Sequence, residues 1–154
     1  MKAMVLKDIS PVEKEPLVLT DLPIPVPGPE EVLIKISSCG ICHTELDEIE
    51  GRIKPALPII LGHEIVGRVE SLGSEVTKLK LDDRIGIAWI NSSCGKCFFC
   101  QEGNENLCLE FKGTGCNKNG GYAQYTVVSE DFTYPIPERF SDSEAAPLLC
   151  AGAI

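Results

Sequence analysis

The chain has 154 residues, of which 23 are acidic and 14 basic, giving a formal net charge of −9. Binding of nucleic-acid phosphates requires a basic face, so this charge argues against a nucleic-acid partner. The length suits one domain with a hydrophobic core. No apolar run is long enough for a signal peptide or for the ~20 residues of a membrane span. We therefore expect a cytoplasmic protein without membrane contact.

The first third of the chain indicates β-structure. Residues 1–6 and 17–20 are short apolar segments, and each predicts a strand. Every other residue from 23 to 29 is proline, which indicates extended connecting chain at a sheet edge, because proline fixes φ and lacks an N–H donor. The alternating residues 31–36 predict another strand, which runs into a glycine turn and then a short helix.

Strands and turns continue through the middle of the chain. Residues 59–69 are interpreted as two strands around a glycine turn, and residues 84–89 as a strand that leads into a cysteine-rich segment. The Asn-Gly pair at 119–120 predicts a hairpin-type turn, with residues 122–128 continuing as a strand.

The last segment predicts a helix. Ser141 and Glu144 form a capping box, and small and apolar residues follow it from 145 to 154. This helix has no polar cap or basic final turn, so we expect the chain to have been cut from a longer one.

Half of the eight cysteines fall within one short polar segment, as Cys94, Cys97, Cys100 and Cys108. Zinc takes four thiolates at tetrahedral corners, and a Cys-x-x-Cys step lets one tight turn supply two of them. The spacing predicts a closed, structural zinc site in a cysteine lobe of about residues 91–110. Buried or disulfide-bonded cysteines are the alternative, but a chain without an export signal favours metal binding.

A second group of side chains could form a catalytic zinc site, which needs three protein ligands and one open position. Cys42 and His63 lie in two separate glycine-punctuated turns, and Cys150 is isolated near the C-terminus. A hydrogen-bonded turn histidine and a core cysteine are the alternatives for His63 and Cys150. Cys39 and Cys42 could instead form a redox pair, although the βαβ context of such pairs is missing.

Six segments occur in the order found in zinc-dependent medium-chain alcohol dehydrogenases, which the chain therefore resembles from Cys39 onward. They are residues 40–46 (GICHTEL), 61–67 (LGHEIVG), 83–86 (DRIG), the cysteine lobe, 120–125 (GGYAQY) and 148–152 (LLCAG). The resemblance implies a mainly β fold, a GroES-like partly open β-barrel with a few short helices and a zinc-binding lobe, over residues 1–154. The Rossmann NAD(P) domain of that family is missing, since residues 113–118 only approach the Gly-x-Gly-x-x-Gly pattern.

The resemblance also implies which residues bind metal. Cys42, His63 and Cys150 match the ligands of the catalytic zinc, and the four cysteines of the lobe match those of the structural zinc. Glu64 resembles a carboxylate beside the catalytic zinc that can act as an alternate ligand. Glu45 stands where relatives often carry an aspartate that accepts a hydrogen bond from the ligating histidine.

Further roles are implied around the substrate. Thr44 resembles the hydroxyl that takes the alcohol proton, and His43 the residue near the cofactor phosphates. Asp47 replaces a histidine that ends the proton relay in several relatives, so the relay must end at water, at His43 or at a carboxylate. Trp89 matches a position that lines the substrate pocket in some relatives, and a core tryptophan is the alternative.

The implied activity is oxidation of a small alcohol to an aldehyde or ketone, with hydride transfer to NAD(P)+. The resemblance implies that the full-length protein, a homo-oligomer, carries out this reaction, while the 154-residue chain alone is inactive. A free-standing, zinc-stabilised GroES-like binding module without catalysis is the alternative hypothesis. A nucleic-acid-binding zinc ribbon is a more distant one.

Overall fold

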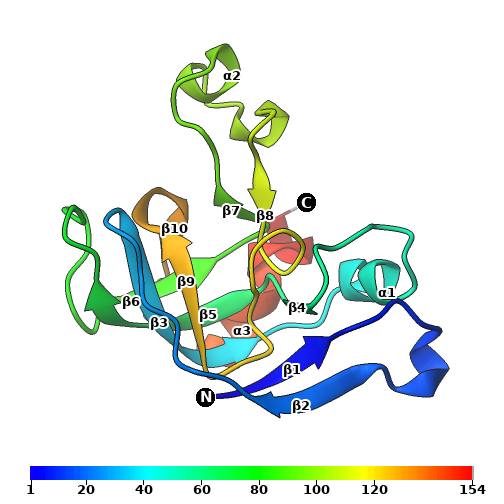
Figure 1. Ribbon diagram of the computed structural model, residues 1–154. Coiled ribbons are helices and arrows are strands. Elements are labelled where there is room, and N and C mark those ends of the chain that lie inside the picture. The colour runs from blue at the N-terminus through cyan, green and yellow to red at the C-terminus, as the bar shows by residue number, and fades with distance from the viewer. Residues whose placement is uncertain (154) are drawn as a thin grey trace.

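The structure, a computed structural model, describes residues 1–153 and is mainly β (Figure 1). Its strands are β1 Lys2–Leu6, β2 Leu17–Asp21, β3 Glu31–Cys39, β4 Ile59–Ile60, β5 Ile65–Leu72, β6 Arg84–Ile87, β7 Ile90–Ser92, β8 Lys112–Gly113, β9 Tyr125–Ser129 and β10 Thr133–Pro135. The α-helices are α1 His43–Ile49, α2 Phe98–Gln101 and α3 Asp142–Ala145. Single 3-10 turns lie at Val12–Lys14, Glu105–Leu107, Glu130–Phe132, Ala146–Leu149 and Ala151–Ala153.

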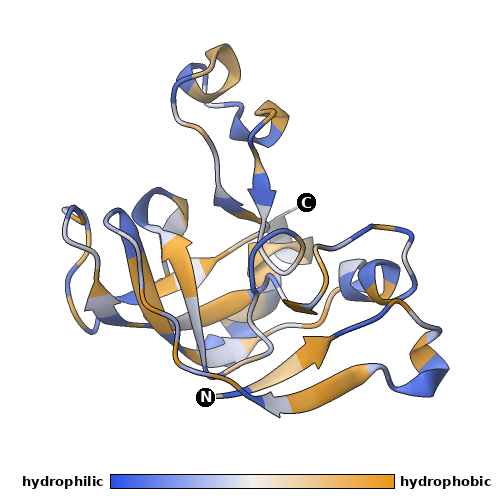
Figure 2. Cartoon of the chain, in the orientation of Figure 1, coloured by the Kyte–Doolittle hydropathy of each residue, from blue (hydrophilic) through white to orange (hydrophobic). Residues whose placement is uncertain are grey.

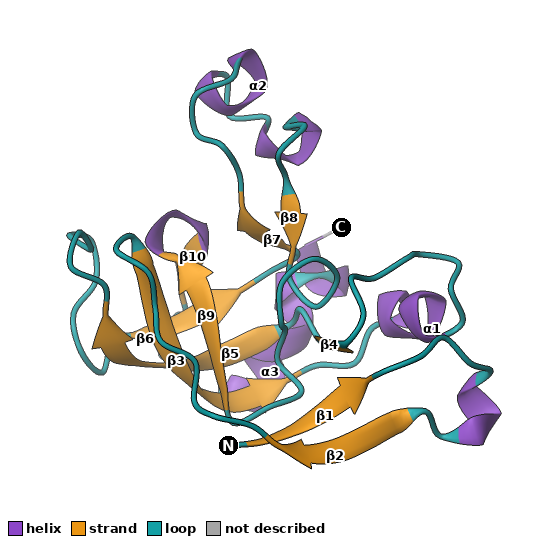
Figure 3. Ribbon diagram, viewed as in Figure 1, coloured by secondary structure: helices purple, strands orange, loops and turns teal. Residues whose placement is uncertain are grey.

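Two antiparallel sheets form the body of the molecule (Figure 3). The larger has the order β10-β6-β5-β3-β9, and the smaller has the order β2-β1-β4. Strand β3 carries register irregularities against β5, after Leu33 and after Ile36, which let it bend as the sheet curls. The result is a partly open barrel, as the family resemblance implied.

The apolar residues of the alternating strands point into this barrel. Figure 2 shows hydrophobic residues along β1, β2, β5 and β9. The main buried cluster joins four strands of the large sheet and consists of Val32, Ile34, Ile65, Val69, Ile85, Ile87 and Val128. A second cluster, Leu6, Ile49, Ile59 and Leu61, packs α1 against β1 and β4. Helix α1 is therefore held by the core, which matters because Cys42 caps its N-terminus.

The cysteine lobe projects from the barrel on a two-stranded stem of β7 and β8 (Figure 1). None of the described residues of α2 or of the turn Glu105–Leu107 is buried. Phe98 and Leu109 are 71% and 99% exposed. The stem is fixed to the barrel by Asn91, whose buried amide Nδ2 donates to the Val127 carbonyl at 3.2 Å. The lobe thus has almost no apolar core of its own.

Three predicted elements differ from the structure. The capping box forms, with Ser141 Oγ accepting from the Glu144 N–H at 3.3 Å, but the predicted helix over 145–154 is wrong. Helix α3 ends at Ala145 and 3-10 turns follow, because Pro147 has no N–H to continue the α-helical ladder; residue 154 lies outside the described residues. The strand predicted over 84–89 ends at Ile87, and the one predicted over 122–128 begins at Tyr125.

Candidate metal centres

The four cysteines of the lobe form the first group of possible metal ligands. The Sγ atoms of Cys94, Cys97, Cys100 and Cys108 all lie within 4.8 Å of one another. Backbone N–H groups point at two of these sulfurs, from Cys97 to Cys94 Sγ at 3.4 Å and from Glu110 to Cys108 Sγ at 3.3 Å. The N–H groups of Lys96 and Cys97 lower the pKa of Cys94 to about 6, which favours the thiolate that a metal needs.

The second group, here called the barrel group, consists of Cys42, His63, Glu64 and Cys150, whose ligand atoms also lie within 4.8 Å of one another. They come from three separate parts of the fold: the N-cap of α1, the turn between β4 and β5, and the chain just after the 3-10 turn Ala146–Leu149. The Sγ atoms of Cys42 and Cys150 are 3.8 Å apart although the residues are 108 positions apart in the chain. Only the tertiary fold brings these residues together.

Glycines shape the turn that carries His63 and Glu64. Gly62 has φ +96°, and a Cβ there would lie 2.8 Å from the Tyr122 ring. A hydrogen bond from the Gly121 N–H to the Gly62 carbonyl, 2.8 Å long, braces the same turn from the segment before β9. A Cβ on Gly40 would lie 1.9 Å from Glu64 Oε2, so the carboxylate fits only because this residue is glycine. The glycines of three sequence motifs thus meet at one turn.

Glu45 joins two of the segments that carry the barrel group. It is buried on the first turn of α1, and its Oε2 accepts the N–H of Cys42 at 2.7 Å. Its Oε1 lies 2.7 Å from Nδ1 of His63, which is itself buried and packs edge-on against Trp89. Since Nδ1 faces Glu45, Nε2 is the nitrogen left for a metal. One carboxylate therefore holds the backbone of one possible ligand and lies beside the ring of another.

The pKa values of the two thiols in the barrel group are shifted in opposite directions. Burial disfavours the Cys42 thiolate, but hydrogen bonds from Thr44 and Cys150 and the nearby His63 outweigh burial and lower its pKa. Burial, and next the neighbouring Cys42, raise the pKa of Cys150 to about 11. A divalent cation bound by both sulfurs would displace their protons. Burial also raises the pKa of Glu64.

These donors fit zinc. Two sulfurs and an imidazole nitrogen are the ligands that zinc prefers, and they leave a fourth position for Glu64, water or a substrate oxygen. The lobe group offers four sulfurs and no such position. The two groups thus have the donor sets of a catalytic and of a structural zinc site, respectively.

The remaining predicted site residues lie on the first turns of α1. Thr44 Oγ1 is 3.5 Å from Cys42 Sγ, at the edge of the barrel group. The side chain of His43 is 75% exposed, with Nδ1 3.5 Å from Asp47 Oδ2. Asp47 is also paired with Arg52, which holds the pKa of that carboxyl below its ordinary value. The surface therefore carries a histidine–aspartate pair beside Thr44.

Two residues were assigned no function from the sequence, although one of them, Arg84, stands in the segment 83–86 that contributes to the resemblance. Glu48, one turn beyond Glu45, is fully buried, and no partner bonds either of its carboxylate oxygens among the described residues. Arg84 spans 58 positions to reach Asp142. Neither has a local signal, because an acidic residue in a charged helix and an arginine in a strand usually face water.

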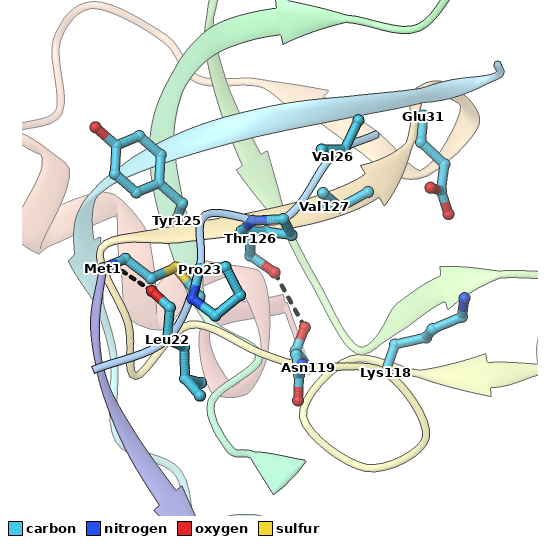
Figure 4. Close-up of a pocket in the computed structure, with 11 residues that line it drawn as sticks. Met1, Leu22, Pro23, Val26, Glu31, Lys118, Asn119, Tyr125, Thr126 and Val127 are labelled. Carbon is cyan, nitrogen blue, oxygen red and sulfur yellow. Dashed lines mark hydrogen bonds between the residues drawn. The ribbon is translucent and has the colours of Figure 1, made fainter. Parts of the chain in front are cut away.

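A pocket of about 430 Å³ lies on another face of the barrel, between the proline-rich segment and β9 (Figure 4). Its lining includes Pro23, Val26 and Val127, and no member of the lobe or barrel group is among the described lining residues. Two polar groups at this pocket are hydrogen-bonded to each other, since Thr126 Oγ1 donates to the Asn119 carbonyl at 3.0 Å. The pocket is therefore separate from both candidate metal centres.

A partly open barrel that carries a four-cysteine lobe and a mixed cysteine–histidine group is the architecture of a GroES-like domain. Residues 28–138 match the family described as "Alcohol dehydrogenase GroES-like domain". The chain belongs to this family. The match favours the dehydrogenase interpretation over a free-standing binding module.

Similar proteins cover nearly the whole chain. An alcohol dehydrogenase of Geobacillus stearothermophilus is 43% identical over 154 residues, which are 99% of this chain and 44% of that protein. An alcohol dehydrogenase of Rhizobium meliloti is 45% identical over 140 residues, 90% of this chain and 41% of that protein. The chain thus spans less than half the length of these relatives.

Solved structures confirm the GroES-like fold. An NAD-dependent alcohol dehydrogenase superposes with a TM-score of 0.90 at 32% identity, over 97% of this chain and 43% of that one. A cobalt- and zinc-bound thermostable alcohol dehydrogenase from Pyrobaculum aerophilum gives 0.86 at 30% identity, over 96% and 44%. Among residues 1–153, no helix is both long and apolar enough to cross a bilayer.

Proposed function

We propose that this chain is the catalytic domain of a zinc-dependent alcohol dehydrogenase, which oxidises a small alcohol to an aldehyde or ketone with NAD(P)+ as hydride acceptor. The observation that carries the proposal is the convergence of the ligand atoms of Cys42, His63 and Cys150, which lie far apart in the sequence. The alcohol dehydrogenases among the relatives support the same assignment.

The barrel group would hold the catalytic zinc through Cys42 Sγ, Cys150 Sγ and His63 Nε2, with Glu64 as an alternate ligand. When bound, zinc supplies the Lewis acidity that lowers the pKa of an alcohol hydroxyl. The four cysteines of the lobe would hold a structural zinc. Burial of His63 and Glu64 keeps water away from one side of the site and strengthens its electrostatics.

The proton of the alcohol would pass to Thr44 Oγ1, which lies at the edge of the barrel group. From there it would reach the surface at the pair of His43 and Asp47, whose facing atoms are 3.5 Å apart. The relay that several relatives end at a histidine would here end at a histidine–carboxylate pair. His43, being exposed, would also face the phosphates of the cofactor.

The cofactor would be bound by a Rossmann domain of the same protein, and the chain of residues 1–154 alone would lack activity. Positioning of the nicotinamide is worth on the order of 7–11 kcal/mol of barrier, and the described residues include no dinucleotide-binding unit. Eight free thiols suit a reducing, cytosolic compartment. The full protein would be a homo-oligomer, as closed symmetric assemblies are common among soluble enzymes.

The test is alcohol-dependent NAD(P)H formation by the full-length protein, loaded with zinc and offered a panel of small alcohols. We expect the parent to be active. In Cys42→Ser we expect activity to fall at least about a hundredfold, because the change removes a metal ligand itself and not merely a group that supports one. The matched control is Cys116→Ser, a buried cysteine outside both groups, which should stay active. A fully loaded parent that is inactive with every alcohol would contradict the proposal and favour the binding module.

A further inference from the structure

The segment that carries Cys150 is weakly structured by itself. Helix α3 and the following 3-10 turn have four residues each, far below the length at which an isolated helix is stable. The N–H of Cys150 reaches the Pro147 carbonyl only at 3.4 Å. The position of Cys150 opposite Cys42 must therefore come from contacts between this segment and the barrel.

Arg84, on the barrel strand β6, makes the polar part of these contacts. Its Nε donates to Asp142 Oδ1 at 2.7 Å, its Nη2 to the Phe140 carbonyl at 2.7 Å, and its Nη1 to the Pro137 carbonyl at 3.3 Å. Its side chain is only 16% exposed. A hydrogen bond from Ser37, and next the Arg84 guanidinium, hold the pKa of Asp142 below its ordinary value, so this partner is ionised. One planar fork thus binds the segment at three points.

Gly86 makes the apolar part of the contact, on the same face of β6 two residues further on. A Cβ at Gly86 would lie 2.8 Å from both Ile136 Cδ1 and Leu149 Cδ2. Leu149 immediately precedes Cys150, and it packs against the buried cluster of Val66, Ala145 and Ala146. The segment is therefore fastened to β6 at its beginning by Arg84 and at its end by Leu149.

We propose that Arg84 is a positioning residue for the candidate zinc ligand Cys150, holding residues 137–142 on β6 so that the thiol is in place before the metal arrives. The inference rests on the proposed metal site. Arginine is needed because its rigid, planar fork directs N–H groups to three oxygens at once, whereas the ammonium of lysine is a point charge on a flexible chain. Preorganisation of this kind lowers the cost of binding.

Arg68 provides a matched control. It stands on β5 directly opposite Arg84 in the sheet register. Among the described residues, its bonds go to Asp82, to the carbonyl at 2.9 Å and to the carboxylate at 3.7 Å, and its side chain is 53% exposed. An arginine-to-lysine change at either position keeps the charge on the same sheet, but only one of them releases the Cys150 segment.

The experiment titrates cobalt(II) into metal-free full-length protein and follows the thiolate-to-cobalt absorption bands, which differ between four-sulfur and mixed sulfur–nitrogen sites. In Arg84→Lys we expect affinity at the barrel group to fall on the order of tenfold, with the lobe affinity unchanged. Asp142→Asn, which keeps the two carbonyl contacts, should give a smaller loss of the same kind. Arg68→Lys should leave both sites as in the parent.

Equal affinity of the barrel group in Arg84→Lys and the parent would overturn the inference. So would equal losses at both sites, because these would show a general destabilisation instead of a positioning role. A parent that binds cobalt at the lobe but not at the barrel group would overturn the proposed site itself, and the inference with it.

Discussion

The two candidate metal centres differ in what builds them. In the lobe, all four ligands lie between residues 94 and 108, on a segment whose described helix and turn bury no residue. In the barrel group, the ligands come from three remote segments, and His63 and Glu64 are 1% and 2% exposed. Metal would therefore order the lobe, whereas the fold itself brings the residues of the barrel group together before metal binds.

Loss of one lobe ligand should have the largest effect. We expect Cys97→Ser to release the lobe metal, to lower thermal stability and to make the cysteine lobe sensitive to protease, because no apolar core replaces the metal. The barrel should stay folded, since its clusters contain no lobe residue. Metal content, thermal melting and the cleavage sites are the measurements. Unchanged zinc content and melting would refute the structural role, and Cys116→Ser is the control.

The stability of the barrel, in contrast, should depend on pH through the buried Glu48 of α1. Burial, and next the like charge of Glu45, raise its pKa to about 7 from an ordinary 4.5, against smaller opposing effects of Cys116 and His63 and a further rise from Asp47. The folded state therefore holds the proton more tightly than the unfolded state. The contribution of Glu48 to the free energy of unfolding is fully present below pH 4.5. It decreases as the pH rises and is lost by about pH 7.

The change amounts to about 3 kcal/mol in the free energy of unfolding. In Glu48→Gln, which keeps the shape and cannot ionise, we expect this part of the pH dependence to vanish and stability above pH 7 to increase. Denaturant unfolding across the pH range measures both. Glu70→Gln, at an exposed position of β5, is the control and should follow the parent. A Glu48→Gln curve parallel to that of the parent would contradict the assignment.

Glu45→Gln should weaken metal binding at the barrel group but not at the lobe, with a smaller effect than the two changes above. The amide keeps the size of the side chain but removes the charge that faces both His63 Nδ1 and the Cys42 N–H. We expect metal affinity at the barrel group to fall about 10- to 100-fold, with the lobe unaffected. Competition with a chelator measures both affinities in one sample. An equal fall at both centres, or none at either, would show that Glu45 does not act on this site.

The sequence predicted the lobe from spacing alone, because its ligands are local. From the sequence, Cys42, His63 and Cys150 were only one possible grouping, and the family resemblance favoured it over the alternatives. Spacing alone cannot show that the sulfurs of Cys42 and Cys150 lie close together. Glu48 was missed because it lies in a helix rich in acidic residues, and only the packing of α1 shows which side is buried. The error in the last helix has a local cause, since the capping box predicted its start while Pro147 limits its length.

The most direct test of the comparison is amide hydrogen exchange in the full-length protein before and after complete metal removal. If metal orders the lobe and the fold orders the barrel group, amides of the cysteine lobe lose protection in the metal-free protein, while those of residues 60–67 and of α1 keep theirs. Protection retained in the lobe, or lost around His63 to the same extent as in the lobe, would contradict this account.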